Sequence, residues 1–171
     1  WRNEGPDAEE KENKKEDKAQ KNAKSQVIVP YVTDTRNILL FEPNVDLGEG
    51  EDRQVFMATL QAALKRAIEQ YFEIESNEIS IEPLPGNQDR KSLLIYETGE
   101  GGAGILREIS KDPKTYLRAL AREALSLMHY EFKNVKRLKV EDLVDTKESC
   151  ADGCYSCLLT YFNQPEHELI H

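Results

Sequence analysis

The sequence predicts an α/β fold in which a small sheet of short strands packs with about three helices and ends in a cysteine-rich knuckle. Three observations support this prediction. Short apolar runs bounded by turn residues indicate strands, and apolar side chains at helical spacing indicate helices. In addition, all 3 cysteines fall within residues 150–157.

Two segments of different composition divide the 171-residue chain. Residues 1–25 contain seven acidic and seven basic side chains and almost no apolar ones, so they cannot bury enough surface to offset the entropy of ordering. We expect a disordered charged leader over residues 1–25 and a folded domain over residues 26–171. Because the chain begins with Trp1 rather than Met, we expect it to be a fragment of a longer protein.

Four short apolar runs predict the strands. They are residues 26–32, 37–42, 78–82 and 92–97. Pro30 places the first strand at a sheet edge, because proline cannot donate a hydrogen bond to a ladder. The fourth run is continuously apolar, which is typical of a strand covered on both faces.

Helical periodicity is clearest over residues 54–72. The apolar stripe of this helix consists of Phe56, Leu60, Ala63, Leu64, Ala67, Ile68 and Phe72. A short helix is predicted over residues 103–109, and a longer one over residues 113–132, where Asp112 is the expected N-cap and Pro113 suits the first turn. The buried stripe of the longer helix is expected to consist of Leu117, Leu120, Ala121, Ala124, Leu125 and Met128.

The glycines of GEGGAG, residues 99–104, match the G-x-G-x-x-G pattern of dinucleotide-binding turns. That mechanism also needs an acidic residue at the end of a second strand about 20 residues later, and here this region is mid-helix. Glu97 and Glu100 would repel a phosphate. We therefore interpret the segment as a tight strand-to-helix turn and expect it to bind no nucleotide.

The formal net charge of −9 lies in the folded part, since the leader is neutral, and it argues against broad electrostatic binding to nucleic acid. The basic run Lys133, Lys136, Arg137 and Lys139 could contact a phosphate locally, but we favour its interpretation as a solvated helix end or turn. No run approaches the ~20 apolar residues of a membrane span, and no secretory signal is visible. An odd number of cysteines fits poorly with disulfides, so a cytoplasmic location is expected.

The three cysteines predict a zinc site. Cys150, Cys154 and Cys157 are spaced as C-x3-C-x2-C, and a glycine turn at Gly153 can fold Cys150 back onto the C-x2-C knuckle. A helix predicted to begin over residues 158–162 would favour thiolates at its N-terminus. We expect one tightly bound zinc with these three residues as thiolate ligands.

A structural zinc requires a fourth ligand. His167 is our prediction, because it follows Cys157 after a break at Gln164 and Pro165 that could return the chain. His171, His129 and a ligand beyond the end of the chain are the alternatives. Two other interpretations of the cysteines stay open: a redox dithiol formed by Cys154 and Cys157, and incidental thiols.

Two motifs give the chain a resemblance to a known family. The segments "LLIYETGEGGAGILREI" and "CADGCYSCLLTYFNQPEHELI" are similar to the MrfA-like zinc-binding domain, and the similarity spans residues 33–171. That domain occurs at or near the C-terminus of large bacterial DEAD/DEAH-box helicases and in a separate subunit of the DISARM phage-defence system. One branch of the family places a fourth cysteine shortly after the C-x2-C pair, where this chain has Phe162 and Asn163.

The resemblance implies a zinc held by the three cysteines, work connected with DNA, and motor motifs located elsewhere. The sequence itself contains neither a G-K-[ST] motif nor an acidic Walker B block. We therefore expect a non-catalytic zinc-binding module that docks on a helicase or ATPase domain, in the same polypeptide or in a partner subunit, and that contacts DNA through this assembly and no membrane. The alternatives are a dithiol redox enzyme, a nucleotide-dependent enzyme and a plain protein-interaction domain.

Overall fold

The computed structural model describes residues 28–133, 135–150 and 152–171, and the chain divides after Asp34 into two compact units. In the first unit, residues 28–34 have no regular secondary structure, so the strand predicted over residues 26–32 is absent from its described part. Pro30 lacks a backbone donor, and a strand without a paired neighbour is not stable by itself. The predicted leader over residues 1–25, and its boundary with the domain, lie outside the described residues.

The second unit contains an antiparallel three-stranded sheet in the order β1-β3-β2. Its strands are β1 (Ile38–Phe41), β2 (Ile79–Gly86) and β3 (Asp89–Glu97). The central strand pairs Ile95 with Ile81 of β2 and Leu94 with Leu40 of β1. Three of the four predicted strands are thus confirmed, and β2 and β3 are longer than expected because a tight hairpin joins them.

The free edge of β2 carries prolines. The Ile81 carbonyl points away from β3, since it accepts a hydrogen bond from Nε2 of Gln61 at 3.0 Å. Side-chain and backbone directions repeat every second residue along a strand, so Pro83 also directs its backbone nitrogen to this edge, where it has no hydrogen to donate.

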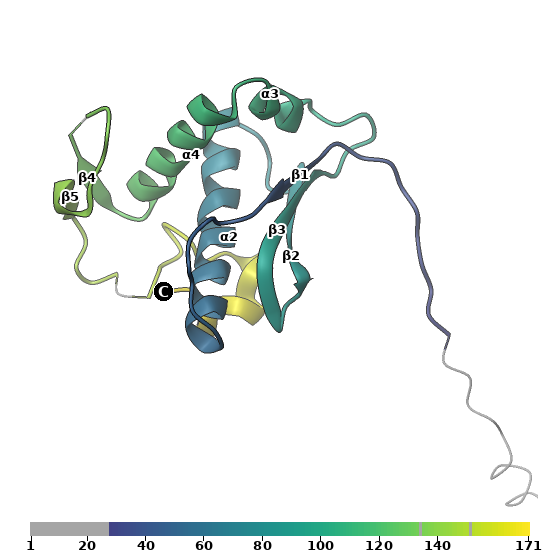
Figure 1. The fold of residues 1–171 in the computed structure, drawn as a ribbon, viewed down its shortest axis with the longest axis horizontal. Coiled ribbons are helices and arrows are strands. Elements are labelled where there is room, and N and C mark those ends of the chain that lie inside the picture. The colour runs from purple at the N-terminus through teal and green to yellow at the C-terminus, as the bar shows by residue number, and fades with distance from the viewer. Residues whose placement is uncertain (1–27, 134, 151) are drawn as a thin grey trace, which may run out of the picture. The chain divides into compact units, whose positions relative to one another are not determined.

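The described residues form three α-helices: α2 (Glu51–Phe72) packs on the sheet, α3 (Ile105–Lys111) contacts β3, and α4 (Pro113–Leu127) packs on α2. Helix α2 lies between the sheet and α4 (Figure 1). The core contains Met57, Ala67 and Ile68 from α2, Ile79, Leu93 and Ile95 from the sheet, Ile109 and Leu120 from the other helices, and Cys157, Leu158 and Ile170 from the C-terminal segment. The predicted fold class is confirmed.

Helix α4 ends earlier than predicted. The turn at Met128 and His129 stops it, and His129 adopts the left-handed conformation with φ of 69°. The chain then forms β4 (Tyr130–Phe132), which pairs with β5 (Leu143–Asp145) after the short 3-10 helix η1 (Val140–Asp142). This hairpin lies beyond the C-terminal end of α4 (Figure 1).

The C-terminal segment forms a 3-10 helix, η2 (Tyr161–Leu169), in place of the helix predicted from residue 158. A reciprocal cap starts it: the Asn163 backbone N–H donates to Oγ1 of Thr160 at 3.3 Å, and the Thr160 N–H donates to Oδ1 of Asn163 at 2.7 Å. Beyond η2, Ile170 is fully buried, and the His171 N–H donates to Oγ1 of Thr59 on α2 at 3.0 Å.

Candidate metal centre

Four side chains converge at one point of the second unit. They are His129, Cys150, Cys154 and Cys157, whose ligand atoms all lie within 4.8 Å of one another. The sulfurs of Cys150 and Cys157 are 3.7 Å apart, and Nε2 of His129 lies 3.3 Å from the sulfur of Cys154. Three soft sulfurs and one imidazole nitrogen form a donor set that suits zinc.

The geometry of the four atoms also fits zinc. A tetrahedral site with Zn–S bonds of about 2.3 Å places neighbouring sulfurs about 3.8 Å apart. The separation of 3.7 Å between Cys150 and Cys157 already matches this spacing. Small side-chain movements are therefore sufficient to place all four atoms around one ion.

Local turns bring the three cysteines together. The Cys157 and Leu159 backbone N–H groups both donate to the Cys154 carbonyl, at 2.9 and 3.1 Å. The Cys154 N–H in turn donates to the sulfur of Cys157 at 2.9 Å. Gly153 has φ of 83°, a conformation that favours glycine and that returns Cys150 to the same point, as the sequence predicts.

His129 reaches the cluster because of the way α4 ends. Its left-handed conformation turns the chain out of the helix, and its carbonyl accepts hydrogen bonds from N and Oγ1 of Thr146, at 2.9 and 2.7 Å. Thr146 follows β5, so the root of the β4–β5 hairpin holds His129 in place. A long-range contact of this kind leaves no spacing motif in the sequence.

His167, the fourth ligand expected from the sequence, is not among these atoms. Its Nε2 lies 3.0 Å from the Thr160 carbonyl oxygen and 3.0 Å from Oδ1 of Asn163, and its ring packs edge-on against Tyr155. The 3-10 helix kinks at Asn163 and runs on through Pro165, and along this path His167 does not join the cysteines. His171 lies apart as well, with Nδ1 at 3.4 Å from Oδ1 of Asp152. Among the described residues, the structure brings His129, and not His167, to the three cysteines.

The thiols of Cys150 and Cys154 differ in how readily they lose a proton. The hydrogen bond with His129 lowers the pKa of the Cys154 thiol to about 5, although burial opposes it. Burial, together with hydrogen bonds to the other two thiols, raises the pKa of Cys150 to about 12. Three adjacent thiolates repel one another, so without a metal ion they do not all lose their protons. A bound cation neutralises this charge and favours the deprotonated form of every thiol that binds it. Nζ of Lys147, 3.4 Å from the sulfur of Cys154, adds a further positive charge.

The centre is continuous with the hydrophobic core. Cys157 is 1% exposed and packs in the same buried cluster as Leu158 and Ile170. Its carbonyl accepts a hydrogen bond from Nε of Arg66 on α2 at 3.1 Å. The metal ligands therefore connect the C-terminal segment to α2 and to the end of α4.

The glycine turn encloses a carboxylate. Glu97 is 1% exposed; its oxygens accept hydrogen bonds from Nδ2 of Asn37 at 2.8 Å and from the Leu106 N–H at 2.9 Å. Gly102 passes so close that a Cβ atom there would lie 1.8 Å from Oε2 of Glu97. The turn thus packs around an internal acid, which gives its glycines a structural role.

Lowering the pH is expected to destabilise the fold through Glu97. Burial alone would raise the pKa of its carboxyl, but hydrogen bonds from Asn37, Leu106, Gly104 and Ile105 outweigh burial and hold the pKa below its ordinary value of 4.5. The unfolded chain then binds more protons than the folded chain, so this contribution is present above pH 4.5 and is lost as pH falls through the lowered pKa.

Urea unfolding of the wild type and of Glu97→Gln from pH 6 down to pH 3 checks this expectation. The pKa values of Glu108 and Asp112 are also lowered, by side-chain hydrogen bonds to Lys111 and Thr115, and both acids remain in the variant. The difference between the two proteins therefore isolates Glu97. Equal pH slopes for the two proteins would contradict the role assigned to Glu97.

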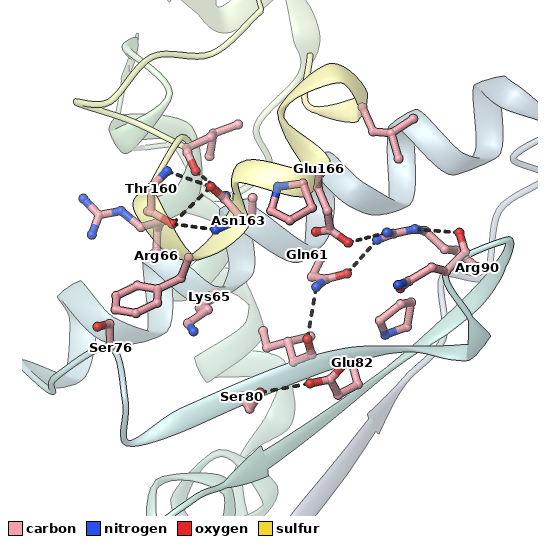
Figure 2. A pocket seen from close by; sticks show the side chains of 18 of the residues that line it. Gln61, Lys65, Arg66, Ser76, Ser80, Glu82, Arg90, Thr160, Asn163 and Glu166 are labelled. Atoms are coloured by element: carbon pink, nitrogen blue, oxygen red, sulfur yellow. Dashed lines mark hydrogen bonds and ion pairs between the residues drawn. The ribbon is translucent and has the colours of Figure 1, made fainter. Parts of the chain in front are cut away.

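A polar cavity of about 660 Å³ lies between α2, β2 and η2 (Figure 2). Arg90, only 1% exposed, forms an ion pair with Glu166 and donates to Oε1 of Gln61 at 2.8 Å. On the other side, Arg66 lies 3.5 Å from Glu69. The side chain of Arg90 bonds to those of Glu166 and Gln61 across the cavity, and these bonds link η2 to the sheet and to α2.

An apolar groove of about 840 Å³ lies between α2 and α4. The sequence predicts a buried stripe on α4, but of its members only Leu120 and Ala124 are buried. The others line the groove together with Val55, Phe56 and Leu60 of α2; they are Leu117, Ala121, Leu125 and Met128. Glu51 and Asp52 lie at its margin. The fold therefore leaves part of an apolar helix face uncovered.

A family model described as MZB, the MrfA Zn-binding domain, matches residues 60–158, which is more than half of the chain. The matched region includes His129 and all three cysteines. No curated protein and no solved structure matches. No helix of the described residues is long and apolar enough to cross a membrane.

Proposed function

Because the chain belongs to the MrfA Zn-binding domain family, we propose that it is a non-catalytic zinc-binding module of a helicase-type system that processes DNA, in repair or in phage defence. The module acts in a reducing cytoplasm, where its three free cysteines stay available for the metal. The observation that carries the proposal is the cluster of half-buried His129, Cys150 and Cys154 with buried Cys157, all inside the matched region.

The number of protein ligands supports a structural role for zinc. Catalytic zinc sites have three protein ligands and keep one position open for water or substrate, whereas structural sites have four. This centre offers four, and Cys157 is 1% exposed. The zinc stabilises the knuckle, the end of α4 and the C-terminal segment relative to one another.

The apolar groove between α2 and α4 supports a docking role. Half-buried Leu117, Leu125 and Met128 form an apolar strip that an apolar face of another domain could cover. Glu51 and Asp52 at the margin favour a basic residue beside that face. We assign the groove to a helicase or ATPase domain, in the same polypeptide or in a partner subunit.

Leu125→Glu is expected to weaken binding to that ATPase domain by more than about tenfold, because a charge would be buried in an apolar contact. Isothermal titration of the zinc-loaded chain with the ATPase domain encoded in the same polypeptide or beside it measures the effect. Ser126→Glu is the matched control, since Ser126 is exposed and does not line the groove. Equal binding by both variants, or no binding by the wild type, would exclude the docking role.

The lowered pKa of Cys154 favours one second candidate, a dithiol redox enzyme. In that case Cys154 and Cys157 would cycle between thiol and disulfide, and the purified chain would contain little zinc. Stoichiometric zinc and unreactive thiols in the native protein support the structural site. A plain interaction domain, by contrast, would hold zinc but bind no ATPase domain.

A further inference from the structure

The loop that follows β4 is locally basic in an acidic chain. It contains Lys133, Lys136, Arg137 and Lys139, all exposed, and the sequence has no acidic residue between the first and the last of them. None of the four forms an ion pair with another side chain in the described residues. This agrees with the solvated turn expected from the sequence, and the structure shows that the turn belongs to the connection between β4 and β5 of a β-hairpin.

This loop is braced against α4. The Arg122 guanidinium lies over the Phe132 ring, 5.5 Å from its centroid, and it also donates a hydrogen bond to the Val135 carbonyl. The Lys139 N–H donates to Oδ2 of Asp142 at 3.0 Å, which fixes the far end of the loop. A braced loop loses little entropy when it binds, so its cations are presented in a preorganised arrangement.

Both ends of the hairpin meet the metal centre. His129 immediately precedes β4, and Cys150 follows β5 after a short connection that includes Lys147, whose Nζ lies 3.4 Å from the sulfur of Cys154. The candidate ligands His129 and Cys150 therefore lie at the two roots of the hairpin, and a bound metal ion would tie both roots to the cysteine cluster.

We propose that this basic loop binds the phosphate backbone of nucleic acid. The proposal rests on the DNA-processing function proposed above and assigns that function a contact site. Up to four phosphates can be neutralised, and the contact is independent of sequence because it involves backbone charges only. Three exposed acids lie on the strands and on η1: Glu131, Glu141 and Asp145. They would repel phosphate, so the attraction for the nucleic-acid backbone is confined to the basic loop.

The test is fluorescence anisotropy of labelled 20-nucleotide single-stranded and duplex DNA with the zinc-loaded 171-residue chain. We expect the logarithm of the binding constant to fall with the logarithm of salt concentration, with a slope of about −3.6 for duplex and about −2.8 for single-stranded DNA if all four cations make contacts. Lys136→Glu/Arg137→Glu is expected to lower affinity more than about tenfold at 50 mM salt and to reduce the slope by about 2.

The matched control is Lys114→Glu/Arg118→Glu, which makes the same charge change at the other end of α4. It should bind DNA within about twofold of the wild type, and zinc content and circular dichroism confirm that both variants fold. Equal losses in the two variants, no binding by the wild type, or binding only to vesicles of phosphatidylserine would overturn the proposal. Because the assay contains no ATPase domain, its result is independent of the docking experiment.

Discussion

Replacing His129 with alanine is expected to lower the zinc affinity of the chain by more than about 100-fold. Loss of a residue that merely supports a metal ligand costs about 10- to 100-fold, and loss of a ligand costs more. His129 supplies the one nitrogen of the cluster and lies 3.3 Å from the sulfur of Cys154. Competition between the protein and a chelator of known affinity measures the change.

His167→Ala is the matched control for this experiment. Its ring nitrogen contacts Thr160 and Asn163 at the start of η2, so its loss should cost about 1 kcal/mol of stability and leave zinc affinity unchanged. Cys157→Ser should lower both the zinc affinity and the stability of the fold, since Cys157 is a candidate ligand and a member of the core. If His167→Ala released zinc and His129→Ala retained it, the assignment of the fourth ligand would be reversed.

Gly102→Ala is expected to lower the free energy of unfolding by about 3 kcal/mol or more, because displacing a buried carboxylate from its hydrogen-bond donors leaves a charged group unsatisfied. The new methyl group would overlap Oε2 of Glu97, which Asn37 and the Leu106 N–H hold in place. The φ of 65° at this residue adds strain for any side chain. Urea unfolding of the zinc-loaded protein measures the loss.

Gly99→Ala provides the control in the same turn. A Cβ atom there would meet nothing within 4 Å, and the residue does not have a positive φ. Its effect should stay within about 0.5 kcal/mol. If the two variants lost similar amounts of unfolding free energy, close packing of Gly102 against Glu97 would not be the reason for the loss.

Elements with strong local signals could be predicted from the sequence. The stripe from Phe56 to Phe72 identifies α2, and Asp112 with Pro113 identifies the start of α4, where the Thr115 N–H does donate to Oδ1 of Asp112. The end of α4 could not be predicted, because it depends on pairing between β4 and β5 and on the left-handed turn at His129. Such contacts form between residues that are distant in sequence.

The same distinction applies to the metal centre. Cys150, Cys154 and Cys157 are close in sequence, so their spacing alone indicates a common point. His129 lies before a whole hairpin, and its partner Thr146 lies after it, so only the folded chain brings them together. Proximity in sequence favoured His167, but the 3-10 helix η2 holds that residue away from the cysteines.

The prolines of β2 also affect how the sheet could grow. An incoming strand from another molecule pairs with a sheet only where the edge offers backbone donors. Pro83 withholds one along β2, and Gln61 occupies the Ile81 carbonyl beside it. Strand addition is therefore directed to β1, which contains no proline and exposes Ile38 and Leu40. If the domain is destabilised, its molecules should associate into longer sheets through β1. The substitution Leu40→Lys should suppress this association.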